Sequence, residues 1–174
     1  MSYLSITETG MLLKIALLVW LMVCVFSDLR TRAVSGWLTI PPLAAAGIWL
    51  VLRGEWLVAL YLAMLVFVLP AMVNDVKAGV WGIVALGLAG TVRMQADILL
   101  VLALTVVFLL WWYGGLGGAD VRVMMFLVIM LSPLVLLPIG LAGGVQALVA
   151  TVRKKRTIPY MVAIAVGTVA MLFL

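Results

Sequence analysis

Two aspartates, Asp28 and Asp120, are the residues whose type and position in this sequence could carry out catalysis. The chain of 174 residues contains six acidic residues, one cysteine and no histidine. Without histidine, a histidine-based triad or a zinc-metalloprotease motif cannot form. Cys24 alone can supply neither an internal disulfide nor a thiolate metal cluster. We therefore expect chemistry carried out by carboxylates, with no metal and no cofactor.

A pair of neighbouring aspartates could activate water against a peptide bond. The ionised carboxylate would take a proton from water, and the protonated partner would donate a proton to the carbonyl oxygen. Two carboxyl groups about 3 Å apart share one proton because both cannot ionise. Poor solvation raises the pKa of a carboxyl group. A helix N-terminus at Asp120 would oppose that rise and could hold Asp120 as the ionised base.

The other four acidic residues have structural explanations. We expect Asp97 to be a helix N-cap. Asp75, in the stretch NDVK, suits a tight turn, in which Asn and Asp are favoured. Glu8 and Glu55 lie at segment ends and require no function.

Each of the two aspartates also has a structural alternative. Asp28, in SDLRTR, could be an interfacial acid neutralised by Arg30 and Arg32, and Asp120 could cap the helix that begins VRVMMF. Capping does not explain the glycines of WWYGGLGGAD, since each costs backbone entropy on ordering. Such a run is useful where backbone approaches another chain or where a loop moves. It predicts an active-site loop made of Gly115, Gly117, Gly118 and Ala119.

The elements that must position these residues are membrane helices. Apolar residues make up 68% of the chain, charged residues 10%, and the mean hydropathy is +1.38. These values are far from those of a soluble domain. We predict an all-α, polytopic bundle that forms a single domain over residues 1–174. About eight transmembrane segments (six to eight) are expected, at 11–27, 38–52, 56–73, 78–92, 97–113, 121–137, 138–152 and 158–174.

The basic residues predict how the segments are oriented. Eight of the eleven Lys and Arg residues lie in the loops at 28–37, 74–77, 114–122 and 153–157. With eight crossings these loops share one side, which the positive-inside bias makes cytoplasmic. An even number of segments separates Asp28 from Asp120, so both carboxyl groups would lie at the cytoplasmic face. The net charge of +5 is explained by orientation, and no nucleic-acid partner is expected.

Three motifs occur in order along the chain: DLRTR at 28–32, GGAD at 117–120 and IPY at 158–160. Together they resemble the motifs of the type IV prepilin peptidase and preflagellin peptidase family, the GxGD-type membrane aspartyl proteases. The sequence departs from the family pattern in several ways. Ala119 replaces the second glycine of G-x-G-D, and Arg122 stands where Lys is usual. The Pro-Asn after the first motif is missing, and the two aspartates are farther apart than is typical.

The resemblance implies that Asp28 and Asp120 are catalytic. It implies a pilin-like or archaellin-like precursor as substrate, cut behind its short basic leader at the cytoplasmic face of a prokaryotic cytoplasmic membrane. The cysteine-containing loop of methylating members is not seen, so cleavage without N-methylation is expected. Asp75 competes with Asp120, because NDVK resembles a G-D-V-K form of the motif. Asp75 lacks the glycines, which favours Asp120.

Two functions of other classes stay open. A catalytically silent membrane scaffold or assembly factor of a pilus system is suggested by Ala119 and by the missing Pro-Asn. A small proton-coupled transporter could relay protons through its aspartates. A transporter predicts acids near the bilayer midplane and often an inverted repeat. This chain instead has acids at segment ends and no repeat.

Overall fold

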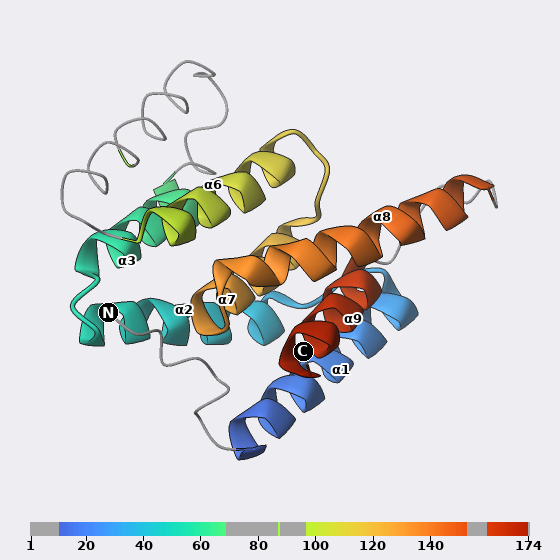
Figure 1. Ribbon diagram of the computed structural model, residues 1–174, viewed down its shortest axis with the longest axis horizontal. Helices are drawn as coiled ribbons and strands as arrows, with labels where there is room; N and C mark the ends of the chain where they lie inside the picture. The colour runs from blue at the N-terminus through green and yellow to red at the C-terminus, as the bar shows by residue number, and fades with distance from the viewer. Residues whose placement is uncertain (1–10, 69–86, 88–96, 153–159, 174) are drawn as a thin grey trace.

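Every element in the part of the chain that the computed structural model describes is a helix, which confirms the all-α prediction (Figure 1). The structure describes residues 11–68, 87, 97–152 and 160–173. Most of the predicted segment 78–92, together with Glu8 and Asp75, lies outside these residues. The seven described α-helices are α1 (Met11–Thr31), α2 (Gly36–Leu52), α3 (Trp56–Ala63), α6 (Ile98–Trp112), α7 (Gly118–Met130), α8 (Leu136–Val152) and α9 (Tyr160–Phe173). A π-helical turn, η1 (Met64–Val68), follows α3, and a 3-10 turn, η2 (Pro133–Val135), precedes α8.

Helix α7 lies at the centre of the bundle (Figure 1), where it packs against α2 on one side and α6 on another. Its residues are apolar around most of the helix circumference, and Val123, Met125, Leu127 and Val128 are almost fully buried. A helix that is apolar on all faces needs protein or lipid on all faces. The central position of α7 follows from this pattern.

Helix α9 packs between α8 and α1, and its closest approach is made at a glycine. A Cβ at Gly167 would lie 2.5 Å from the Cα and backbone N of Ile139 in α8. No real side chain tolerates such contacts with backbone, so only glycine lets the two helices come this close.

A tryptophan fixes α1 to its neighbours. The ring of Trp20 packs edge-on against Phe126 of α7, with centroids 4.9 Å apart. The indole Nε1–H of Trp20 donates a hydrogen bond of 2.9 Å to the backbone carbonyl of Leu38 in α2. Aromatic pairs in this geometry are worth about 0.5–1.5 kcal/mol beyond the burial of their area. One side chain therefore ties α1 to both helices.

The predicted boundary between the segments 121–137 and 138–152 is wrong. Helix α7 ends at Met130, and a new start follows at Ser132, whose hydroxyl accepts the backbone N–H of Leu134 at 3.2 Å. Pro133 comes next, at a position where proline suits a helix start because its missing N–H would be unsatisfied in any case. The Ser-Pro pair in LSPL therefore marks the break between the two helices. This break lies before the expected boundary between residues 137 and 138.

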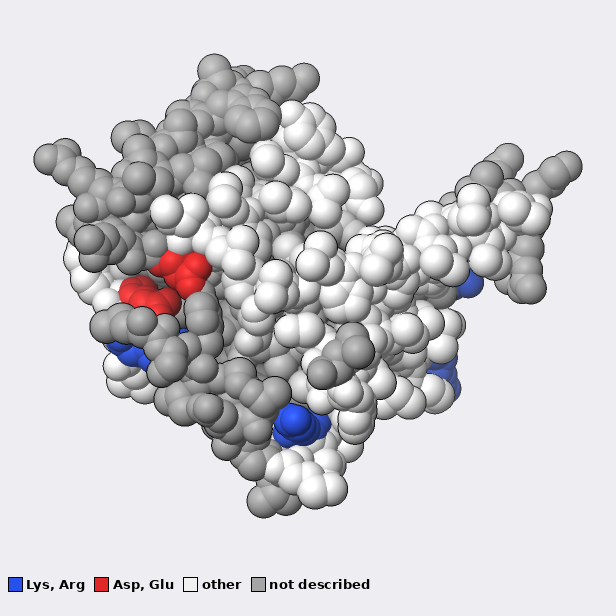
Figure 2. Space-filling model, in the orientation of Figure 1, with Lys and Arg blue, Asp and Glu red and all other residues white. Residues whose placement is uncertain are grey.

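Apolar side chains cover much of the outer surface. Leu137, Leu141, Val145 and Leu148 of α8 are between 64% and 74% exposed. Charged groups are sparse on the face shown in Figure 2, whereas soluble monomers rarely expose apolar patches larger than a few hundred Å². Among the described residues, one helical stretch, Pro133–Ala150, has the length and hydropathy of a membrane span, and four other apolar helices are shorter. Since a perpendicular span needs about 20 residues, insertion of the whole bundle stays a prediction.

Candidate functional site

Asp120 lies in the first turn of α7, where its carboxylate faces the start of the helix. Its Oδ2 accepts the backbone N–H of Gly117, the N-cap residue, at 3.3 Å. The carboxylate therefore satisfies one of the N–H groups that a helix start leaves without an intrahelical partner. Negative charge at this position is also favoured by the helix dipole. The expected N-cap position of Asp120 is wrong, because α7 begins at Gly118 and its N-cap is Gly117; Asp120 is the third residue of the helix and reaches back to that cap.

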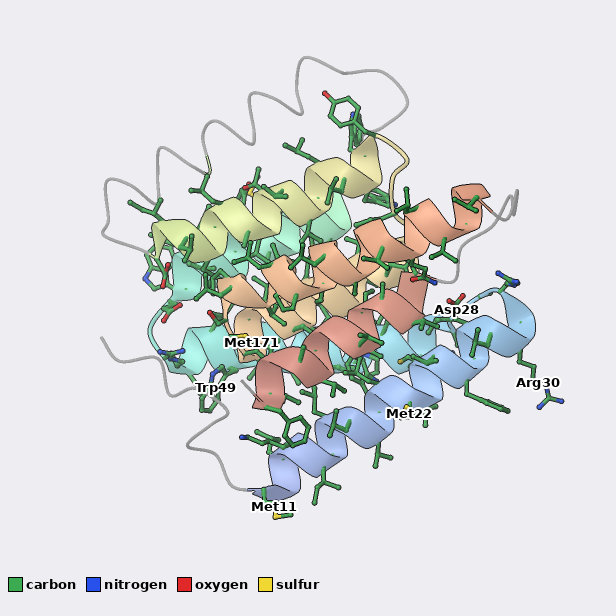
Figure 3. The ribbon with its side chains drawn as sticks, turned by 45° about the vertical axis from the view of Figure 1, so that its right-hand side comes forward. Met11, Met22, Asp28, Arg30, Trp49 and Met171 are labelled. Carbon is green, nitrogen blue, oxygen red and sulfur yellow. The ribbon has the colours of Figure 1, made fainter. Side chains whose placement is uncertain are left out.

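Asp28 continues the buried stripe of α1. Leu17, Leu21 and Cys24 recur at spacings of four and three residues and are between 0% and 6% exposed. Residues at such spacings share one helix face, and Asp28 is the next member of the series. Its side chain is half-buried and points toward α9, while Arg30 points away from the bundle (Figure 3).

The expected neutralisation of Asp28 by Arg30 and Arg32 is not found. Both arginines are exposed, and neither forms an ion pair with Asp28 among the described residues. The Asp28 Oδ2 atom is instead buried, without a hydrogen-bond partner in the described part of the chain. Burying an oxygen of a carboxyl group without a partner costs free energy, so this position needs another explanation.

The charge of Asp28 acts on Asp120. The pKa of Asp120 is raised to about 6, mainly because burial disfavours the charged form. The N–H of Gly117 lowers this pKa, and the negative charge of Asp28 raises it further. The two carboxyl groups, from the end of α1 and the start of α7, therefore belong to one electrostatic neighbourhood. A carboxyl group with a pKa near 6 can exchange a proton close to neutral pH.

Tyr160, the first residue of α9, is a third polar group in this neighbourhood. A Cβ at Gly143 would lie 2.5 Å from the Tyr160 hydroxyl oxygen, so the phenol rests directly on the bare backbone of α8. The negative charge of Asp120 acts on the same phenol. In the sequence, Tyr160 stands out only as part of the IPY motif. The spacing between Gly143 and Tyr160 would have given no sign of their contact.

The glycines before Asp120 have identifiable structural roles. The N–H of Gly114 bonds to the carbonyl of Trp111, and that of Gly115 to the carbonyl of Leu110, both at 2.8 Å. With Gly114 at a φ of +76°, this is a Schellman motif that ends α6. Gly117 then caps α7. The predicted loop residues Gly118 and Ala119 are the first two helical residues before Asp120, so no long loop separates α6 from α7.

The remaining acids in the described residues lie away from this pair. Asp97 is the N-cap of α6, as predicted, and its side chain accepts the N–H of Leu100 at 3.1 Å. Glu55 pairs with Arg53 at 3.7 Å. Within the described part of the chain, no group of three or more acidic, cysteine or histidine side chains could hold a metal ion.

No protein-family description, curated protein or solved structure matches this chain.

Proposed function

We propose that the chain is a polytopic membrane aspartic endopeptidase. In this proposal it removes the short basic leader from type IV pilin-like or archaellin-like precursors at the cytoplasmic face of a prokaryotic cytoplasmic membrane. The substrate class comes from the motif resemblance. The observation that carries the chemistry is the placement of Asp28 and Asp120 in one half-buried neighbourhood, with the pKa of Asp120 raised to about 6.

In the proposed mechanism the two carboxyl groups share one proton. One carboxyl group of the pair is ionised and takes a proton from water as the water oxygen bonds to the scissile carbonyl carbon. The other carboxyl group, protonated, donates its proton to the carbonyl oxygen, giving a tetrahedral diol.

Collapse of the diol breaks the C–N bond. The carboxyl group that took a proton from water then gives it to the leaving nitrogen, while the other carboxyl group takes a proton back from one hydroxyl group of the diol. The products are the leader, with a new carboxyl terminus, and the mature chain, with a free amino terminus. Both aspartates return to their starting protonation states, and the reaction requires only these two residues and water.

The buried Asp28 Oδ2 fits this role. Because this oxygen has no hydrogen-bond partner among the described residues, it is available to a water molecule or to a substrate carbonyl. Further support comes from the exposed apolar surface of the bundle, which suits a lipid environment. Helix ends that meet at one side of the bundle would place such a site at the membrane boundary.

The proposal is tested by leader removal. The chain is co-expressed with a pilin-like precursor, and mature and precursor forms are compared for wild type and for Asp28→Asn and Asp120→Asn variants. We expect both variants to lose cleavage, while Asp97→Asn keeps it, since asparagine is an equally good N-cap. An Asp75→Asn variant tests the competing assignment. Wild-type cleavage by the Asp28→Asn and Asp120→Asn variants would rule out the protease.

The scaffold function is favoured by one observation. Gly114, Gly115 and Gly117 are all used by the turn between α6 and α7, so the glycine-rich sequence has a purely structural explanation. A scaffold predicts no cleavage by wild type with any precursor. It also predicts that pilus assembly survives both aspartate substitutions, provided that the variants fold. The proton-coupled transporter has no comparable support from the described residues.

A further inference from the structure

A groove along the outside of the bundle is separate from the aspartates. It runs between α2 and α3, has a volume of about 730 Å³ and is lined by apolar side chains, with one exception. The α2 side includes Leu43, Gly47 and Val51, and the α3 side includes Trp56 and Leu60. Volumes of about 300–1,000 Å³ are typical of sites for small ligands.

The exception is Arg122 of α7, the only charged residue among those that line the groove in the described part of the chain. Arg122 is half-buried and makes no hydrogen bond or ion pair with any described residue. A half-buried guanidinium without a partner is costly, since it gives up hydration and gains nothing in return. Arginine presents a planar fork of N–H donors that fits the oxygens of a phosphate or carboxylate.

The position of Arg122 gives the groove a polar end. Val66, in the middle of η1, lines both the groove and a neighbouring cavity of about 50 Å³ that Arg122 also lines. Because α2 and α3 are consecutive helices joined by a short turn, Val66 and Ile40 lie at the same end of the groove. From Ile40 to Val51 the α2 wall extends about 16 Å at 1.5 Å per residue. The site is therefore long, apolar and charged at one end.

We infer that this groove binds an anionic phospholipid, with its phosphate on Arg122 and one acyl chain between α2 and α3. The inference rests on the proposed membrane location but not on the proteolytic activity. Arg122 follows Asp120 at the start of α7, the end of the bundle that the positive-inside bias makes cytoplasmic. A lipid of the inner leaflet has the matching direction, because its headgroup lies at that face and its chains run inward.

The test uses the full chain purified in detergent and native mass spectrometry. Phosphatidylglycerol is compared with phosphatidylcholine carrying the same acyl chains, and with glycerol phosphate as a headgroup without chains. We expect the wild type to retain phosphatidylglycerol about tenfold better than phosphatidylcholine, and not to retain glycerol phosphate. Equal retention of the two lipids, or retention of glycerol phosphate alone, would overturn the inference.

Variants separate the headgroup contact from the groove. Arg122→Gln should lose the preference for phosphatidylglycerol, whereas Arg30→Gln, a change at an exposed arginine that points away from the bundle, should keep it. Arg122→Lys retains the charge without the fork and should give an intermediate preference. Gly47→Leu should fill the groove and reduce retention of both lipids. An unchanged preference in a folded Arg122→Gln variant refutes the contact.

The same preparation distinguishes this inference from the proposed function. Asp28→Asn and Asp120→Asn should abolish cleavage and leave the lipid preference unchanged. If the chain cleaves no precursor but still prefers phosphatidylglycerol in a way that depends on Arg122, only the proposed protease function is refuted. Adding a synthetic precursor tests the other occupant. Displacement of the bound phospholipid by the precursor's apolar helix would assign the groove to substrate and contradict the inference.

Discussion

Replacing Asp120 with asparagine should make the folded protein more stable at neutral pH while abolishing cleavage. Burial raises the pKa of Asp120 from 3.8 to about 6, and the charge of Asp28 contributes. A carboxyl group whose pKa is higher in the folded state binds more protons there than in the unfolded chain. The stability of the wild type therefore falls as pH rises from 3.8 to about 6, and the loss is complete above that range.

The size of the effect follows from the shift. One pKa unit corresponds to about 1.36 kcal/mol, so a fully shielded group would cost about 3 kcal/mol at neutral pH. Asp120 is only half-buried, and we reduce the expected cost to about 1–2 kcal/mol for solvent screening. Asparagine carries no charge and can still accept the Gly117 N–H. The Asp120→Asn variant should thus melt about 2–8 °C higher than wild type near pH 7.5.

The assay is thermal unfolding in detergent at two pH values, followed by tryptophan fluorescence. Near pH 4 most of the wild-type Asp120 is protonated, so the difference between variant and wild type should be small. The Asp97→Asn variant serves as control, because it exchanges one good N-cap for another and should change neither curve. A variant at Asp120 that melts at or below wild type near pH 7.5, or gains equally at both pH values, would refute the reasoning.

Three further outcomes follow from the same contacts and from the glycines. Asp28→Asn should lower the pKa of Asp120 only part of the way toward 3.8, because burial is the larger cause of the shift. A carbon-13 titration of labelled aspartate carboxyl groups measures this pKa. An unchanged pKa would mean that the two groups lie too far apart to interact. Gly167→Ala should destabilise by about 1–3 kcal/mol, because its Cβ would meet the backbone of α8, whereas Gly140→Ala, with nothing within 4 Å, should be neutral or stabilising in the same melting assay. Gly114→Ala should cost about 1 kcal/mol, since its φ of +76° is strained for alanine; an unaltered melting temperature would contradict this account of the α6 terminus.

The sequence was informative where patterns are local. Hydropathy placed α2 and α6 within two residues of their observed ends, 38–52 against Gly36–Leu52 and 97–113 against Ile98–Trp112. The N-cap at Asp97 was also expected, because capping depends on neighbouring residues alone. The end of α7, predicted at 137 and observed at Met130, was missed because the apolar run continues through the Ser-Pro signal, which carries the boundary.

The neighbourhood of the two aspartates could be predicted only in outline. Segment parity put Asp28 and Asp120 at the same end of the bundle, but the buried face of Asp28 depends on how α1 packs. The contact of Tyr160 with Gly143 depends on the close approach of α8 and α9 and has no local signature. The glycines before Asp120 were interpreted as an active-site loop. Gly114 and Gly115 also form the hydrogen bonds that end α6. Neither the number nor the spacing of the glycines reveals this structural role.

The buried stripe of α1 has a consequence for how this protein can change in length. Trp20 anchors the helix, and Asp28 follows two turns later on the face that looks into the bundle. Inserting or deleting one residue between them would rotate Asp28 by about 100° and send its carboxyl group outward. Two whole turns would keep the direction but move the group along the axis by about 10 Å. The number of residues between Trp20 and Asp28 is therefore constrained. Related chains should keep this spacing and vary in length at other positions.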